Sequence, residues 1–215
     1  KHFSLLKLRN GKMVELPTEP ELLPAGQRLW YEKDGPTSDI LFAFNGPPIG
    51  SFDSEVLRFA CRYAHAGLSS LFFNEIRNKR GLAYSTSHAT INFSTRSYFG
   101  TSTEVRPDNV NETISVIFDC YEKLMREGMT QKEIDIWKNR MYFSDKRDVE
   151  SAKSWVQVFD DELYPSDDVC GYYPDIFNFF EIITPEIIKD ILEKYIHLDQ
   201  FHLFVKGKKT GNVYF

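Results

Sequence analysis

A change of hydrophobic period at Gly81 constrains the fold more than any other feature of this sequence. Before the glycine, Leu71, Phe72 and Ile76 fall on one apolar face of a helix. Gly81 stands where a left-handed residue closes a helix. From Tyr84 onward the period becomes two, which is typical of a strand. The stretch therefore predicts a helix, a glycine stop and a strand.

Other patterns along the chain predict four more strands and five more helices. The expected strands cover residues 27–33, 39–45, 83–94 (the strand after Gly81), 97–105 and 200–206. The expected further helices cover residues 53–65, 107–128, 130–164, 174–180 and 184–195. Asp53 and Ser54 are candidate caps, Thr130 and Glu133 form a capping box, and Thr184 precedes a proline. The pattern predicts an α+β fold, in which helices pack on one face of a mainly antiparallel sheet.

Arg77 and Tyr84 form the candidate binding pair, seven residues apart across the predicted turn. An arginine offers a rigid fork of donors, and a tyrosine offers one phenolic donor. Converging beside a sheet, the two groups would hold a peptide carbonyl or a developing oxyanion. The alternative is a surface cation and an ordinary strand aromatic, and spacing alone favours that alternative.

A longer sequence motif surrounds Arg77 and Tyr84 and is similar to a known family signature. It reads Phe72-x-x-Glu75-Ile76-Arg77-x-Lys79-Arg80-Gly81-Leu82-Ala83-Tyr84-Ser85. The motif resembles the signature of the non-catalytic domain of the pitrilysin/insulinase family of zinc metallopeptidases, closest to the mitochondrial-processing-peptidase-like branch. The helix after Thr184 and the strand at 201–207 resemble the end of the same domain, so the resemblance covers residues 27–207.

The resemblance implies a role for the pair and a partner for the chain. In that family the matching arginine and tyrosine bind substrate opposite a zinc-bearing half, so Arg77 and Tyr84 are expected to bind a peptide. The expected partner is a zinc-bearing pitrilysin-type domain, in the same polypeptide or as a second subunit, and zinc belongs to that partner. A homodimer of the domain is a further option. The family's compartments are the bacterial periplasm or cytoplasm and the mitochondrial matrix.

The histidines do not supply the catalytic motif of the family, His-x-x-Glu-His. None of the five is followed by Glu-His three and four residues later: His2, His65, His88, His197 and His202. We interpret His65 as a capping or surface residue and His88 as solvent-facing, on the same strand face as Tyr84. His197 and His202 are interpreted as structural. No catalytic residue, metal ligand or cofactor is therefore expected in this chain, which should not hydrolyse peptides alone.

Composition excludes several other classes. The net charge of −5 argues against a nucleic-acid partner. The sequence contains no run of 18 apolar residues, so we expect no membrane span. Cys61, Cys120 and Cys170 lie far apart, without Cys-x-x-Cys spacing, and the first two are expected to be buried thiols. The first nine residues are too charged for a signal peptide, so any targeting signal is expected outside this chain.

The expected organisation is a linker at 1–26 with one short strand at 3–8, an inactive peptidase domain at 27–207 and a tail at 208–215. The first functional hypothesis is the zinc-free half of a zinc metallopeptidase. The alternative is a catalytically inactive structural or interaction subunit of the same family. A third hypothesis is a stand-alone peptide-binding domain that uses the strand edge beside Tyr84. A His-x-x-Glu-His motif upstream or in a partner would favour the first.

Overall fold

The computed structural model describes residues 24, 26–48, 51–93, 96–148 and 179–210. The strand predicted at 3–8, the thiol of Cys170 and the helical regions predicted at 149–164 and 174–178 lie outside these ranges. Five strands form one sheet: β1 (Arg28–Glu32), β2 (Ser38–Gly46), β3 (Ala83–Phe93), β4 (Arg96–Val105) and β5 (His202–Gly207). Each lies within two residues of its predicted position.

The strands are arranged in the order β1-β5-β2-β4-β3. Only β1 and β5 pair in parallel; the other three neighbouring pairs are antiparallel. The central strand β2 pairs with β4 along its full length, from Ser38 opposite Val105 to Gly46 opposite Ser97. The predicted, mainly antiparallel sheet is confirmed, and β3 forms one edge of the sheet in the described part of the chain.

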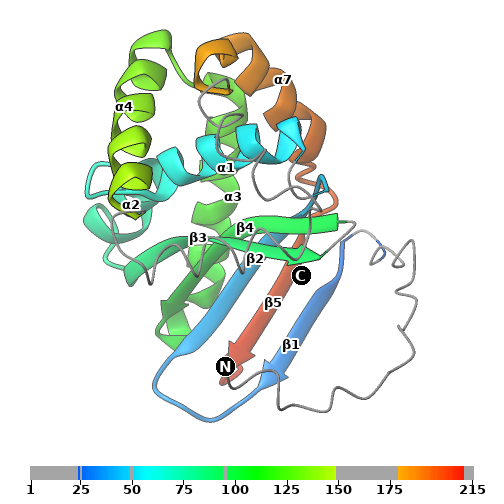
Figure 1. The fold of residues 1–215 in the computed structure, drawn as a ribbon. Coiled ribbons are helices and arrows are strands. Elements are labelled where there is room, and N and C mark those ends of the chain that lie inside the picture. Colours follow the sequence, from blue (N-terminus) through cyan, green and yellow to red (C-terminus); the bar gives the residue numbers. More distant parts are fainter. Residues whose placement is uncertain (1–23, 25, 49–50, 94–95, 149–178, 211–215) are drawn as a thin grey trace, which may run out of the picture.

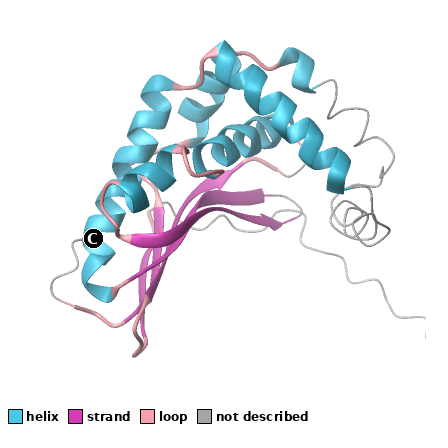
Figure 2. Ribbon diagram, turned by 90° about the vertical axis from the view of Figure 1, so that its left-hand side faces the viewer, coloured by secondary structure: helices cyan, strands magenta, loops and turns pink. Residues whose placement is uncertain are grey.

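The described helices pack on one face of this sheet (Figures 1 and 2). They are α1 (Phe52–His65), α2 (Leu71–Phe73), the π-helical turn η2 (Asn74–Asn78), the 3-10 turn η3 (Pro107–Asn109), α3 (Val110–Glu127), α4 (Gln131–Asp148) and α7 (Pro185–Tyr195). The fold class is therefore α+β as predicted. Figure 2 shows the two layers edge-on, with the opposite face of the sheet free of described helices.

Side-chain caps define where several of these helices begin. The Thr130 hydroxyl accepts from the Glu133 amide, and the Glu133 carboxylate accepts from the Thr130 amide at 2.8 Å, which confirms the capping box. Thr184 caps α7 as predicted. Helix α1 differs: its cap is Ser51, whose side chain accepts from the Ser54 amide. The prediction that Asp53 or Ser54 caps α1 was wrong by two to three residues.

A buried chain of polar groups links α1, β4 and α3. The His65 Nδ1–H donates to the carbonyl oxygen of Cys61 at 2.8 Å, so Nε2 of the neutral ring is an acceptor. The Thr101 hydroxyl donates to that Nε2 at 2.8 Å, and the Tyr121 hydroxyl donates to Thr101 at 2.8 Å. Burial lowers the pKa of His65 to about 3, which keeps the ring neutral. The interpretation of His65 as a capping or surface residue is wrong.

The inner faces of the two layers meet in an aromatic core. Phe42 and Phe44 from β2 and Phe59 from α1 are fully buried, or nearly so.

Cys61 and Cys120 are also buried and free, as predicted for these two thiols. Burial raises the pKa of both thiols to about 12, so neither is a reactive thiolate.

An ion pair between α1 and α7 leads to a prediction on pH. The Lys194 ammonium and the Tyr195 hydroxyl donate to Asp53 at 2.6 and 2.7 Å. The Lys194 bond is the main cause that holds the pKa of Asp53 below its ordinary 3.8. Because this pKa is depressed in the folded state, the stabilisation is present above the unfolded-state pKa and is lost as the pH falls through the folded value.

We therefore expect Asp53→Asn to lower the free energy of unfolding by about 0.5–1 kcal/mol at pH 7 and by much less at pH 3. Urea unfolding at both pH values measures the difference. Asp190→Asn, the same change at an exposed position of α7, should have little effect at either pH. An equal loss at both pH values for Asp53→Asn would contradict the electrostatic explanation.

Candidate functional site

The candidate site begins where a short helix widens into a π-helical turn. After one turn in α2, the Lys79 amide bonds to the Asn74 carbonyl at 3.0 Å, a separation of five residues. Gly81 then adopts φ of +62°, so the predicted left-handed stop is confirmed. The helix was predicted, but its π-helical part was not. Such turns are rare in proteins and are frequent at functional sites.

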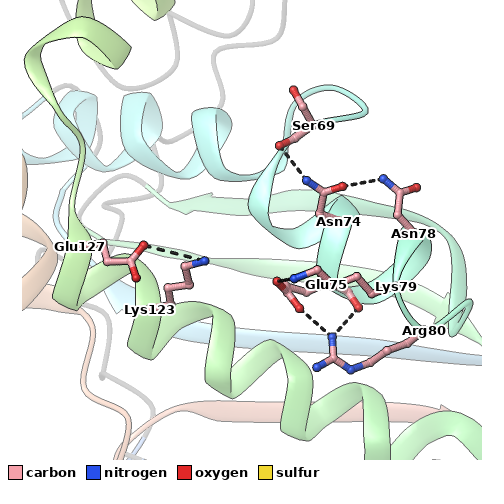
Figure 3. A network of polar contacts seen from close by, with 8 residues as sticks. All are labelled: Ser69, Asn74, Glu75, Asn78, Lys79, Arg80, Lys123 and Glu127. Atoms are coloured by element: carbon pink, nitrogen blue, oxygen red, sulfur yellow. Dashed lines mark hydrogen bonds and ion pairs between the residues drawn. The ribbon is translucent and has the colours of Figure 1, made fainter.

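Side-chain contacts stabilise both sides of this turn (Figure 3). The Glu75 carboxylate accepts from Lys79 Nζ at 2.6 Å and from Arg80 Nη1 at 2.7 Å. These two cations hold the pKa of Glu75 below its ordinary value, the Lys79 bond having the larger effect. On the other side, Asn78 Nδ2 donates to Asn74 Oδ1 at 2.6 Å.

Arg77 and Tyr84 lie in direct contact across the turn, although spacing alone favoured two unrelated surface and strand residues. Arg77 Nη1 donates to the Tyr84 carbonyl at 2.8 Å, and its guanidinium carbon lies 4.4 Å from the centroid of the Tyr84 ring. The Tyr84 side chain is 80% exposed, and its hydroxyl has no hydrogen-bond partner among the described residues. One phenolic donor and the remaining guanidinium donors are therefore available to a ligand.

A β-bulge places Tyr84 on a different face from the one predicted. Ala83 pairs with Val105, and Thr86 pairs with Thr103, so β3 has one more residue than β4 between these pairs. Ala83 and Thr86 are both buried, whereas the two residues between them are exposed. The prediction that Tyr84 shares a strand face with His88 is therefore wrong.

His88 lies under α1 instead of facing solvent, which corrects a second prediction. It is half-buried at a cavity of about 60 Å³ between α1 and the β3–β4 hairpin, with Arg58 on the opposite wall. Burial, followed by the charges of Arg62 and Arg58, lowers the pKa of His88 to about 4. The ring is therefore neutral at physiological pH.

The environments of His65 and His202 do not fit a zinc ligand. The rings of His65 and His88 are 5.9 Å apart, but both nitrogens of His65 are already hydrogen-bonded. His202 is buried, with Nε2 donating to Asn45 Oδ1 at 3.1 Å and Nδ1 accepting from the Gln27 amide at 3.4 Å. Within the described ranges, no three histidine, cysteine or acidic side chains gather as metal ligands would.

Comparison with known proteins identifies the family. The family model of the peptidase M16 inactive domain matches residues 1–141. The chain therefore belongs to the M16 peptidase family, and it matches the inactive domain of that family. An uncharacterised zinc protease of Streptomyces coelicolor is 37% identical over 68 residues, which is 32% of this chain and 15% of that protein.

Two solved structures share the fold. A protease from Helicobacter pylori superimposes with a TM-score of 0.79 and 20% identity, over 96% of this chain and 50% of that one. The M16 inactive domain from Pseudomonas fluorescens superimposes with a TM-score of 0.74 and 19% identity, over 92% of this chain and 48% of that one. The chain thus spans about half the length of either structure.

The sequence patterns do not single out one residue of the site, Phe73. Its ring centroid lies 4.9 Å from the guanidinium carbon of Arg77. The signal that points to it is the spacing of four between Phe73 and Arg77, which brings two helical side chains together.

Among the described helices, none combines the length and the hydropathy that a membrane span requires.

Proposed function

We propose that this chain is the zinc-free half of a zinc metalloendopeptidase, and that Arg77 and Tyr84 bind the peptide substrate opposite the zinc-bearing half. The observation that carries this proposal is the contact between the half-buried Arg77 and the exposed Tyr84. The guanidinium and the phenol lie together, and both have donors that no described residue occupies. A carbonyl oxygen that gains negative charge during hydrolysis would accept from both groups.

The pair can bind and polarise a peptide but cannot activate water. Both groups serve here as hydrogen-bond donors, and the described buried histidines use their ring nitrogens in internal hydrogen bonds. The proposed partner is therefore a zinc-bearing pitrilysin-type domain, in the same polypeptide or as a separate subunit. Zinc bound in that half would supply the activated water.

The position of the pair also favours a peptide over a small molecule. Tyr84 lies near the start of β3, which is an edge strand of the described sheet. An edge strand offers unpaired backbone groups along which an extended peptide can lie. We infer that the substrate approaches along this edge and presents a carbonyl to Arg77 and Tyr84.

The first test is complementation with added zinc. Peptidase activity is measured for this chain alone, for a zinc-bearing half from the same gene or its neighbour, and for both together. Activity in the combined sample only would support the proposal. Inactivity of every combination would favour the structural or interaction subunit, and activity of this chain alone would overturn the proposal.

Tyr84→Phe tests the phenolic donor in the combined sample. We expect kcat/KM to fall about 5-fold, since one neutral hydrogen bond contributes about 1 kcal/mol. Tyr31→Phe is the matched control, because Tyr31 is 68% exposed on β1 at the other edge of the sheet. Equal activity of the Tyr84 variant and the wild type would remove Tyr84 from the site.

A further inference from the structure

Phe73 is an aromatic residue that the core does not use. Its neighbour Phe72 is fully buried and packs on Tyr121, with a centroid distance of 5.0 Å. Phe73, by contrast, is half-buried and lies outside the hydrophobic cluster formed by the described residues. The Phe73 ring instead contacts Arg77, whose guanidinium carbon lies 4.9 Å from the ring centroid. Packing in the core therefore does not explain an aromatic side chain here.

Arg77 is held by aromatic rings and a carbonyl instead of by a carboxylate. Its guanidinium lies over the rings of Phe73 and Tyr84 and donates to the Tyr84 carbonyl. No carboxylate among the described residues pairs with Arg77. The nearby Glu75 carboxylate instead accepts from Lys79 and Arg80. Aromatic faces attract a cation without occupying its N–H donors. The arrangement thus orients Arg77 and keeps most of its donors available.

We propose that Phe73 is a positioning residue of the substrate site. Its ring holds the Arg77 guanidinium next to Tyr84, so that the remaining in-plane N–H groups meet a carbonyl or carboxylate oxygen of the peptide. A guanidinium that is already oriented loses less conformational freedom when it binds. This role rests on the proposed function of Arg77, but the contact itself can be tested independently.

The contact is tested first in the 215-residue chain without a partner. Side-chain ¹⁵N–¹H spectra of Arg77 should show a ring-current shift and slow exchange of the Nε proton with water. Phe73→Leu should reduce the shift to the part that the Tyr84 ring contributes and should speed the exchange, and Phe73→Tyr should restore both. Phe143→Leu is the control, since Phe143 is a 65% exposed phenylalanine on α4. Unchanged Arg77 signals in Phe73→Leu would overturn the proposal.

The second test uses the assembled peptidase and a double-mutant cycle. Phe73→Leu should lower kcat/KM about 3- to 10-fold, which is the range of a cation–π contact. In an Arg77→Ala background it should have no further effect, because Phe73 acts through Arg77. A loss of the same size in both backgrounds would overturn the positioning role and mark Phe73 as merely structural.

The two tests separate this inference from the proposed function. If Arg77→Ala leaves activity intact while Phe73→Leu still changes the Arg77 spectrum, the proposed function fails and the contact stands. If Arg77→Ala abolishes activity while Phe73→Leu changes neither spectrum nor activity, the proposed function stands and the role of Phe73 is overturned.

Discussion

Replacement of Arg77 by alanine is expected to lower kcat of the assembled peptidase by about 100-fold or more, the effect typical of losing one charged or preorganised donor to an oxyanion. The chain itself should remain folded. Arg77 is half-buried, and the group it would leave behind is the Tyr84 carbonyl, which lies near the surface and can bind water instead. The loss should therefore appear in turnover and not in stability.

Arg77→Lys separates charge from geometry. A lysine keeps the positive charge but has no planar fork, so we expect it to restore only a small part of the activity. Arg126→Ala is the control, because Arg126 is an exposed arginine in the last turn of α3. Steady-state kinetics and urea unfolding of the wild type and the three variants measure the losses of turnover and of stability separately. Full activity of Arg77→Ala would show that the site assignment is wrong.

Local signals in the sequence predicted the elements that carry the site. Gly81 has the positive φ that its place after the helix required. Thr130 and Glu133 form the reciprocal hydrogen bonds that their spacing indicated. In both cases the determining contacts join residues close in sequence, so a pattern of a few residues was sufficient. The contact between Arg77 and Tyr84 is also local, but their spacing alone favoured a surface cation and an ordinary strand aromatic.

Contacts between distant segments set the features that the patterns missed. The bulge before Thr86 depends on the register that β3 adopts against β4, and no pattern within β3 shows it. His65 occupies the last position of α1, where a histidine at a surface would look the same. Its burial depends on Thr101 and Phe72, which come from other elements.

The buried polar chain also connects the core to the site. The His65 ring stacks on Phe72 at 3.9 Å, and Phe72 packs edge-on against Tyr121. The next residue along α2 is Phe73, which contacts Arg77. The short helix that carries Phe73 is thus anchored in the core through its buried neighbour Phe72. Damage to this part of the core should therefore both destabilise the fold and loosen the candidate site.

Tyr121→Ala is expected to destabilise the protein by about 4 kcal/mol, as is typical for removing a large buried aromatic side chain. Tyr121 is fully buried, and its ring lies 4.9 Å from that of Phe44 and 5.7 Å from that of Phe42. Its hydroxyl also donates to Thr101. Urea unfolding measures the loss as a change in the free energy of unfolding.

Two variants divide this loss into its parts. Tyr121→Phe keeps the ring but removes the donor to Thr101, so we expect a loss of only about 1 kcal/mol. Tyr31→Ala removes a tyrosine that is 68% exposed, and it should change stability by about 0.5 kcal/mol or less. A loss below about 1 kcal/mol for Tyr121→Ala would mean that the aromatic core does not support α2 as the structure indicates. A large loss with Tyr121→Phe alone would instead assign the main stabilisation to the hydrogen-bonded chain through Thr101 and His65.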